Sequence, residues 1–375
     1  MIERKDLKKC HRIVIKVGTS TLTYKNGQLN LQRIDHLVRQ IADLHNQGKE
    51  VLLVSSGAIG VGANRMGFKK VPSTMPEKQA LAAIGQGSLL HIYEKIFAEY
   101  GKIVAQVLLT RGDFDERIRY LNAANALLAI LNMGVIPIIN ENDTVVVEEI
   151  RFGDNDTLSA LVAGVVNADL LIILSDVDGL YDCDPRLNQD ASLLSEVDEI
   201  TEEIEERSRS RGSKFSSGGM YTKLKAARMC MAAGVPMIIA NSDEHNVIAR
   251  LMDGEELGTL FIPRAEKMQA RKKWIAFGRL PQGEIMVDEG AKEALLNQGK
   301  SLLPSGIIGV SGDFQPGEVV KVVTAGGKEI ARGLTNYSAE EIRLIAGKNT
   351  RYIEKILGYK DYDEVIHRNN LWVEV

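Results

Sequence analysis

The sequence predicts a mainly parallel α/β sandwich followed by a small β-rich domain. Short runs rich in Val and Ile recur up to about residue 240, and helical patterns lie between them. Strands buried on both faces of a parallel sheet read as continuous apolar runs, and their alternation with helices is typical of an α/β fold. After residue 264, closely spaced turns indicate a second domain of mostly β structure.

Five apolar runs are the expected strands of the parallel sheet. They are "RIVIKVG" at 12–18, "VLLVSSG" at 51–57, "VIPIIN" at 135–140, "LLIILSD" at 170–176 and "VPMIIAN" at 235–241. Ligands of such sheets bind beyond the carboxyl ends of the strands. The residues that follow each run are therefore the first candidates for a functional site.

Apolar residues at three- and four-residue spacing predict the helices between these strands. The predicted helices span 31–44, 118–133, 157–167 and 223–233. Asn30 is the expected N-cap of the first helix, and Gly48 is its expected stop. Asp156 or Thr157 is expected to cap the third helix.

The composition changes at residue 264 and predicts a domain boundary there. Residues 1–263 form the expected catalytic domain, the charged stretch 264–279 a linker, and residues 280–375 a second domain. Turn signals such as "PQGE", "PSG" and "AGGKE" punctuate the second domain, with a strand expected at 318–323 and helices near 291–298 and 338–346. From residue 264 onward the sequence contains 17 Lys and Arg and 15 Asp and Glu, which gives a net charge of +2.

The overall composition disfavours several classes of protein. The net charge of −4 gives no general reason to expect nucleic acid or an anionic membrane as a partner. The three cysteines form no C-x-x-C pair, and the six histidines show no metal-ligand spacing, so we expect no metal bound directly by protein side chains. We see no signal peptide and no apolar stretch of about 18 residues. A cytoplasmic protein with reduced thiols is expected.

Two glycine-containing turns follow the first two apolar runs. Lys16 lies inside the first run and is followed by "VGTST", where Gly18 and the hydroxyls suit a polyphosphate. The alternative is a lysine whose ammonium group extends into water at the edge of the sheet. In "VSSGAIGVG", the hydroxyl groups of Ser55 and Ser56 and the amides near Gly57 suit a carboxylate or a phosphate, whereas the alternative is tight strand–helix packing.

Two polar clusters, "INENDTV" at 139–145 and "FGDNDTLSA" at 152–160, are the strongest signal of a site. Their polar members are Asn140, Glu141, Asn142, Asp143, Asp154, Asn155 and Asp156. Amides supply both donors and acceptors, and carboxylates hold an ammonium group, orient a lysine or bind Mg²⁺ through water. Capping and polar turns are the alternative, but they require fewer polar residues than these clusters contain.

Three further segments have open interpretations. The stretch "SSGGMYTK" at 216–223 supplies glycines, a hydroxyl and Lys223 but does not match a P-loop, so it is either another kind of phosphate loop or a surface turn. "LSDVDGLYDCDP" at 174–185 lacks EF-hand spacing and is either a nucleotide-contacting loop or a plain turn. The charge run at 196–212 is either a solvated helix or loop, or a lid. Lysines, glycine loops, amides and aspartates together are typical of phosphoryl transfer.

Six segments in chain order carry a resemblance to a known family. "IVIKVGTSTLT", "VSSGAIGVG", "INENDTV", "FGDNDTLSALVA", "LSDVDGLYDCDP" and "GGMYTK" resemble the glutamate 5-kinase branch of the amino acid kinase superfamily, and the tail that begins "GEIMVDEGAKEALLNQGKSLLPSGI" resembles a PUA domain. The resemblance implies ATP- and Mg²⁺-dependent conversion of L-glutamate to L-glutamyl 5-phosphate, the first step of proline biosynthesis. It also implies that proline inhibits the enzyme and that the enzyme is a dimer or tetramer. A glutamyl phosphate reductase would receive the product.

The resemblance also implies roles for residues at matching positions. Lys16 and Lys223 would contact the transferring phosphoryl group, and Asp156 would orient both lysines. The residues that would bind L-glutamate are Ser56, Asp143 and Asn155. The residues that would contact ATP are Lys16, Ser175, Asp176, Ser217, Gly218, Gly219, Met220, Tyr221, Thr222 and Lys223. Ser217 stands where the family pattern has Thr, and it keeps the hydroxyl.

Three alternatives stay open at this point. The acceptor of an amino acid kinase is instead acetylglutamate, aspartate, carbamate or a nucleotide in other branches of the superfamily. RNA binding through the PUA region is a second alternative, which the balanced charge of that region disfavours. An inactive homologue is the third, although all the expected polar residues are present.

Overall fold

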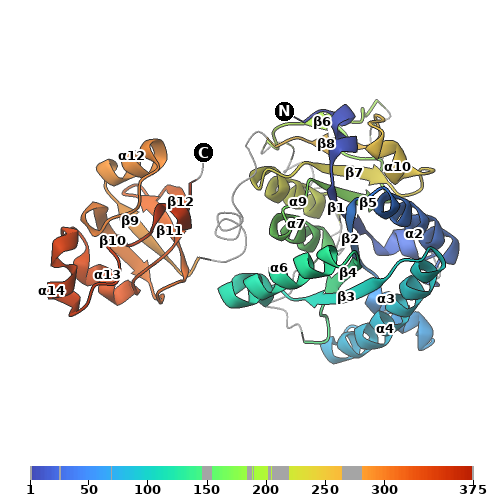
Figure 1. The fold of residues 1–375 in the computed structure, drawn as a ribbon, viewed down its shortest axis with the longest axis horizontal. Helices are drawn as coiled ribbons and strands as arrows, with labels where there is room; N and C mark the ends of the chain where they lie inside the picture. The colour runs from blue at the N-terminus through green and yellow to red at the C-terminus, as the bar shows by residue number, and fades with distance from the viewer. Residues whose placement is uncertain are drawn as a thin grey trace. The chain divides into compact units, whose positions relative to one another are not determined.

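The computed structural model describes residues 2–24, 27–68, 70–145, 154–183, 188, 190–201, 204, 219–263 and 281–373. The chain divides into two compact units, Met1–Lys267 and Met268–Val375, and each is described by itself (Figure 1). Residues 264–280 lie outside the described residues, so the linker at 264–279 and the boundaries of the two domains stay predictions.

The first unit is built on an eight-stranded sheet with the strand order β3-β4-β2-β1-β5-β7-β8-β6. Its strands are β1 Arg12–Val17, β2 Glu50–Ser55, β3 Val104–Leu109, β4 Ile136–Glu141, β5 Leu170–Ser175, β6 Glu196–Val197, β7 Met237–Asn241 and β8 Thr259–Phe261. Every neighbouring pair is parallel except β7 and β8. The predicted mainly parallel sheet is therefore confirmed.

The five predicted strands correspond to β1, β2, β4, β5 and β7, whereas the sequence did not predict the other three. The strand β3 lies at an edge of the sheet and is partly exposed, so it tolerates a polar residue. Gln106 interrupts its apolar run, and the pattern of a buried strand is lost. The strands β6 and β8 have two and three residues, too few for a pattern.

Helices cover both faces of this sheet (Figure 1). They are α1 Thr19–Leu22, α2 Leu31–Asn46, α3 Ala58–Arg65, α4 Met75–Glu99, α5 Gly112–Asp115, α6 Arg117–Asn132, α7 Asn155–Val165, α9 Met220–Ala232 and α10 Val247–Met252, with the 3-10 helix η1 Arg4–Lys9 before β1. The helices α7 and α9 lie on one face, and α2, α4 and α10 lie on the other.

The four predicted helices correspond to α2, α6, α7 and α9, and the caps of α2 are as expected. The side chain of Asn30 accepts a hydrogen bond from the Arg33 amide at 3.1 Å, and Gly48 follows the helix with φ +81°. The long helix α4 was not predicted, because apolar residues lie all around it. Leu89 is fully buried in the core, while Ile84 is exposed.

The alternation of side chains along β1 explains how a lysine comes to lie buried between the sheet and its helices. Ile13, Ile15 and Val17 belong to the core between the sheet and the helices α2, α4 and α10. Because successive side chains of a strand point to opposite faces, Lys16 faces α7 and α9. Lys16 is only 5% exposed, so its charge needs a partner on that face.

The second unit contains a five-stranded sheet in the order β10-β9-β11-β12-β13, antiparallel except where β9 meets β11. Its elements are β9 Gly283–Val287, α12 Glu289–Gln298, η3 Pro304–Gly306, β10 Ile307–Gly312, β11 Val319–Thr324, β12 Glu329–Leu334, α13 Ala339–Ile345, η4 Thr350–Tyr352, α14 Ile353–Leu357, η5 Arg368–Asn370 and β13 Leu371–Val373. The strand predicted at 318–323 and both predicted helices are present as β11, α12 and α13. Within the described residues, no helix is long and apolar enough to cross a membrane.

Candidate active site

The carboxyl ends of the central strands lie at one edge of the sheet. Val17 at the end of β1 is in register with Ser55 at the end of β2, and Ser175 of β5 is in register with Asn241 of β7. Polar residues that follow these strands therefore come together, as they do in other parallel sheets.

Three buried charges meet near this edge, on the face covered by α7 and α9. Lys16 Nζ lies 2.5 Å from Asp156 Oδ1, and Lys223 Nζ lies 3.3 Å from Asp156 Oδ2. Thr222 Oγ1 donates a hydrogen bond to Asp156 Oδ2 at 2.7 Å. The charged side chains are 6%, 0% and 4% exposed for Lys16, Asp156 and Lys223. We call these four residues the ionic cluster.

The start of α7 explains why Asp156 is available to both lysines. Asp154 is the N-cap, and its carboxylate accepts from the Thr157 amide at 2.6 Å and from the Thr157 hydroxyl at 3.0 Å. The prediction that Asp156 or Thr157 caps this helix is therefore wrong. Asp154 satisfies the helix end, so Asp156, in the first turn, turns its carboxylate to the lysines.

The start of α9 places Thr222 and Lys223. Gly219 is the N-cap. Its carbonyl oxygen lies 2.8 Å from Thr222 Oγ1, the hydroxyl oxygen that also contacts Asp156. The helix begins at Met220, three residues before its predicted start. Tyr221 is exposed, whereas Ser217 and Gly218 lie outside the described residues.

Burial and mutual attraction set the protonation of the ionic cluster. Burial alone would raise the pKa of Asp156, but Lys16, Lys223 and the hydrogen bonds outweigh it and lower that pKa. Burial lowers the pKa of Lys223, with Lys16 adding to this effect and Asp156 opposing it. Two ammonium groups share one carboxylate, so the cluster keeps a net positive charge that suits a phosphoryl group.

A chain of neutral side chains joins the ends of β2 and β4 to α7. Asn155 Nδ2 donates to Ser56 Oγ at 2.8 Å and to Asn140 Oδ1 at 3.0 Å. Asn140 Nδ2 in turn donates to Gln86 Oε1 at 2.7 Å. We call Ser56, Gln86, Asn140 and Asn155 the amide network. It brings two of the three predicted glutamate-binding residues, Ser56 and Asn155, into contact.

The helix α4 supports this network, and no sequence motif indicated its contribution. Gln86 supplies the end of the network, and about two turns later Tyr93 OH lies 3.0 Å from Ser55 Oγ in a buried contact. Their partners lie 54 and 38 residues away in the sequence, which no motif spacing reports. Only a prediction of α4 and of its packing would have found them.

Other predicted site residues follow the ends of β4 and β5, and Asp176 acts on the ionic cluster by raising the pKa of Lys223. Ser175 ends β5 and donates to Asp176 Oδ1 at 3.1 Å. Asp143 lies in a turn just beyond β4. Asp178 accepts from Asn241 at 2.7 Å and from Tyr181 at 2.8 Å, so part of the 174–185 segment is an ordered turn. Residues 202–203 and 205–218, which include most of the 196–212 charge run, lie outside the described residues.

All the elements that carry the ionic cluster lie within the part of the chain that matches a known family. The model of the amino acid kinase family matches residues 11–241, which include β1, α7 and α9. The chain belongs to the amino acid kinase family. A second family model, that of the PUA domain, matches residues 283–357. The predicted resemblance to an amino acid kinase with a PUA domain is confirmed.

Two relatives of this amino acid kinase, similar over almost the whole chain, are glutamate 5-kinases. "Glutamate 5-kinase" of Thermoanaerobacter sp. (strain X514) is 57% identical over 360 residues, which is 96% of this chain and 97% of the relative. "Glutamate 5-kinase" of Moorella thermoacetica is 54% identical over 367 residues, 98% and 97% of the two chains. A solved UMP kinase structure from Bacillus anthracis is 20% identical, with a TM-score of 0.47 over 68% of this chain and 97% of that chain. The family match and the glutamate 5-kinases at 57% and 54% identity show that the chain is a kinase.

Proposed function

We propose that this kinase transfers the γ-phosphoryl group of ATP to the side-chain carboxylate of L-glutamate and so carries out the first step of proline biosynthesis. The observation that carries the proposal is the ionic cluster, in which Lys16 of β1 and Lys223 of α9 share the carboxylate of Asp156. The names of relatives at 57% and 54% identity support L-glutamate as the acceptor.

The chemistry of this reaction matches the residues present. A glutamate side chain has a pKa of about 4.3, so it is already an anionic nucleophile at neutral pH and needs no general base. The obstacle is repulsion between two anions, about 4 kcal/mol for unit charges 4 Å apart at an effective dielectric constant of 20. Positive groups that cancel this repulsion are therefore the main catalytic requirement.

The transfer forms one bond and breaks one bond. A carboxylate oxygen of glutamate bonds to the γ-phosphorus, and the bond from this phosphorus to the bridging oxygen of ADP breaks. Lys16 and Lys223 contact the transferring group and neutralise the charge on both sides of it. Asp156 pairs with both ammonium groups, which offsets their mutual repulsion and orients them, and no proton has to move.

The nucleotide side of the site is the predicted set of contacts around α9 and the end of β5. Amides near Gly219 and the following residues cradle phosphate oxygens at the start of the helix, where the helix dipole favours anions. Ser175 and Asp176 contact the nucleotide from the end of β5. Ser217 and Gly218 complete the loop in the same proposal.

Magnesium enters this proposal with ATP rather than through protein ligands. Among the described residues, no group of three His, Cys, Asp or Glu side chains is arranged to hold a metal ion. When bound to the nucleotide, Mg²⁺ supplies further cancellation of phosphate charge. The lysines of the ionic cluster are the positive charges that the protein itself supplies to the phosphoryl group, while Mg²⁺ arrives bound to ATP.

Ser56, Asp143 and Asn155 bind L-glutamate in this proposal, and proline acts as a feedback inhibitor at or near the same site. The neutral side chains of the amide network suit the polar α-substituents of an amino acid, since amides offer both donors and acceptors. We also propose a cytoplasmic homo-oligomer, a dimer or tetramer, that passes its product to a glutamyl phosphate reductase. Light scattering of the purified protein measures the oligomeric state.

The test is formation of a hydroxamate from L-glutamate and hydroxylamine in the presence of ATP and Mg²⁺, because hydroxylamine traps an acyl phosphate. Aspartate and N-acetylglutamate are run in parallel, and the glutamate reaction is repeated with proline. Hydroxamate with glutamate alone is expected, and its loss with proline supports feedback inhibition. Hydroxamate with a different acceptor only, or with none, contradicts the proposed substrate.

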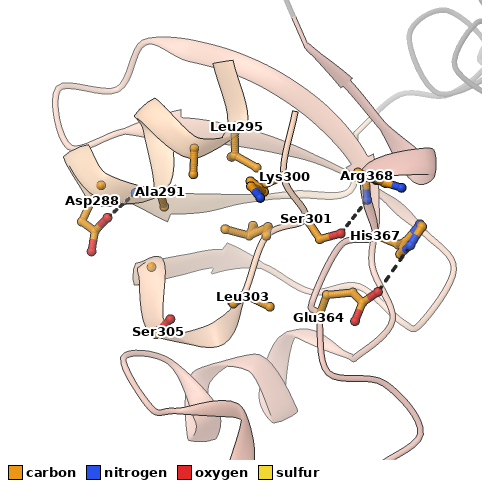
Figure 2. A pocket seen from close by; sticks show the side chains of 14 residues that line it. Asp288, Ala291, Leu295, Lys300, Ser301, Leu303, Ser305, Glu364, His367 and Arg368 are labelled. Carbon is orange, nitrogen blue, oxygen red and sulfur yellow. Dashed lines mark hydrogen bonds and ion pairs between the residues drawn. The ribbon is translucent and has the colours of Figure 1, made fainter. Parts of the chain in front are cut away.

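One feature of the second unit favours RNA binding as a second candidate function. A cavity of about 680 Å³ lies against α12, and Lys300 and Arg368 are among its lining residues (Figure 2). Both carboxylates that line it are engaged, since Asp288 accepts from the Ala291 amide at 2.7 Å and Glu364 lies 3.6 Å from His367. No ion pair within the described residues involves Lys300 or Arg368. Lys300 and Arg368 are therefore the charged groups of this cavity that are available to a phosphate, beside the two carboxylates that already have partners.

Retention of a labelled single-stranded RNA on a filter tests this second candidate. Two phosphate contacts predict a slope of about −1.4 for log binding constant against log salt. The double substitution Lys300→Ala and Arg368→Ala should abolish retention without changing hydroxamate formation. Absence of salt-dependent retention in the parent protein removes this candidate and leaves the kinase proposal as it is.

A further inference from the structure

Gln86 is the end of the amide network and comes from a helix outside every sequence motif. Its Oε1 accepts from Asn140 Nδ2 at 2.7 Å, and Asn140 Oδ1 accepts from Asn155 Nδ2 at 3.0 Å. Asn155 Nδ2 also donates to Ser56 Oγ at 2.8 Å. A continuous hydrogen-bonded path therefore connects α4 with the two residues proposed to bind the acceptor.

Backbone groups indicate the direction of two of the three amides in this path, those of Asn140 and Asn155. The Glu141 amide can only donate, and it lies 2.9 Å from Asn140 Oδ1, so the nitrogen of Asn140 must face Gln86. The Ser55 carbonyl can only accept, and it lies 3.1 Å from Asn155 Nδ2. The carbonyl oxygen of Asn155 is therefore directed away from the Ser55 carbonyl, as an acceptor suited to the ammonium group of an amino acid.

Gln86 satisfies a donor that has little access to water. Asn140 is 3% exposed, so its Nδ2 group without an acceptor would be a buried, unsatisfied donor. Rotation of Asn140 toward another acceptor would withdraw Oδ1 from Asn155 at the same time. Gln86 therefore supports the hydrogen bond that Asn140 Oδ1 accepts from Asn155, in addition to the backbone contacts of both amides.

Close helix packing holds Gln86 in place. A Cβ atom at the preceding Gly85 would lie 1.8 Å from the Ala58 carbonyl oxygen, and one at Gly62 would lie 1.9 Å from the Leu81 carbonyl oxygen. The helices α3 and α4 are therefore in backbone contact at this point. Since α3 begins at Ala58, two residues after Ser56, this contact ties Gln86 to the loop that carries Ser56.

We infer that Gln86 is a positioning residue for recognition of the acceptor, and that it acts through Asn140 on the amide of Asn155. This inference rests on the proposed function, in which Asn155 binds L-glutamate. It assigns to α4 a part in substrate selection that the family motifs do not contain.

The test is steady-state kinetics of hydroxamate formation by Gln86→Met, which keeps the size of the side chain and removes its acceptor. We expect KM for L-glutamate to rise about tenfold, the effect of one lost hydrogen bond, while kcat and KM for ATP stay within about twofold. Gln40→Met is the matched control, because Gln40 is a buried glutamine of α2 whose Oε1 accepts from the Ile248 amide at 3.0 Å. It should leave KM for L-glutamate unchanged.

A double-mutant cycle with Asn140→Ala tests whether Gln86 acts through Asn140. In the Asn140→Ala background, Gln86→Met should cause no further rise in KM for L-glutamate. Gln86→Asn, which shortens the amide, gives the same readout if Gln86→Met fails to fold. Additive effects, an unchanged KM in both Gln86 variants, or an equal rise in Gln40→Met would overturn the inference. An inactive parent protein would instead overturn the proposed function.

Discussion

The ionic cluster and the amide network meet at the same edge of the sheet but are built on opposite principles. In the cluster, the charged ammonium groups of Lys16 and Lys223 pair with the buried carboxylate of Asp156. In the network, neutral amides such as Asn155 take their direction from backbone groups. Charge cancels repulsion between anions, whereas oriented amides distinguish one polar substrate from another. In the proposed mechanism, the ionic cluster therefore sets the rate of transfer and the amide network selects the acceptor.

The two regions also differ in what a single substitution costs. Removal of one member of a buried ion pair leaves an uncompensated charge, which costs about 3–5 kcal/mol. Loss of one neutral hydrogen bond costs about 0.5–1.5 kcal/mol. Substitutions in the cluster should therefore have the larger effects, and the following tests run from the largest effect to the smallest.

Asp156→Asn should have the largest effect on stability. It leaves two buried ammonium groups without their shared carboxylate, so the free energy of unfolding should fall by about 3–5 kcal/mol in urea titrations at neutral pH. Asp243→Asn is the control, because Asp243 pairs with Arg33 at 2.6 Å on the surface. This control should change stability by no more than about 1 kcal/mol. Equal stability of the two variants would contradict a buried role for Asp156.

The stabilising effect of Asp156 should also depend on pH in one direction. Its pKa is lowered in the folded protein, so its contribution is complete above the unfolded pKa of about 3.9 and disappears as the pH falls through the lowered value. The stability difference between the parent protein and Asp156→Asn should therefore be constant from pH 5 to pH 7, to about the accuracy of the titrations. A difference that already shrinks in this range would contradict the lowered pKa.

Lys223→Ala should lower kcat by about 10²–10³-fold, the effect of removing one group that stabilises charge in the transition state. Stability should change little, since Lys16 and Asp156 remain as a neutral pair. Lys225→Ala provides a control on the same helix, because Lys225 is exposed. Turnover near that of the parent protein in Lys223→Ala would show that this lysine does not take part in the transfer.

Residues of both regions stand in sequence motifs, but the pairing of Asp156 with Lys16 and Lys223 was implied only by the family resemblance, and nothing in the sequence indicated the link to Gln86. Lys16, Asp156 and Lys223 are charged residues in apolar or glycine-rich surroundings, which is an unusual pattern that a sequence displays directly. The central strands were predicted for the same reason, since burial on both faces gives continuous apolar runs.

Gln86 and Tyr93 could not be predicted, because their partners are neighbours only in space. The helix that carries them has apolar residues on all sides, which conceals its buried face. The cap of α7 was also ambiguous. Asp154, Asn155 and Asp156 are consecutive residues that can each cap a helix, and only the backbone geometry selects Asp154.

Gly85→Ala and Gly87→Ala test whether close packing of α3 and α4 supports the amide network. Both glycines lie on α4, but a Cβ atom at Gly85 would lie 1.8 Å from the Ala58 carbonyl oxygen, while one at Gly87 would meet nothing within 4 Å. Gly85→Ala should lower the free energy of unfolding by about 1–3 kcal/mol and raise KM for L-glutamate. Gly87→Ala should raise stability by up to about 1 kcal/mol, as is usual for glycine in a helix. Thermal and urea unfolding measure both changes, and equal effects would contradict this packing.

The smallest expected effect is on the pH dependence of kcat/KM. Burial lowers the pKa of Lys223, so this lysine should lose its proton below the ordinary lysine pKa of 10.5. Because transfer requires the charged form, kcat/KM should decline with rising pH before that value is reached. Lys223→Arg stays charged in this range and should lose the decline. The same decline in Lys223→Arg would assign it to another group.

The most direct test of the division between the two regions is to measure hydroxamate formation as a function of L-glutamate concentration for the parent protein and for Lys223→Ala. We expect the parent protein to form glutamyl hydroxamate with ATP and Mg²⁺. We expect Lys223→Ala to keep the KM for L-glutamate while kcat falls about 10²–10³-fold. No product from glutamate in the parent protein, or a raised KM with unchanged kcat in the variant, would contradict these expectations.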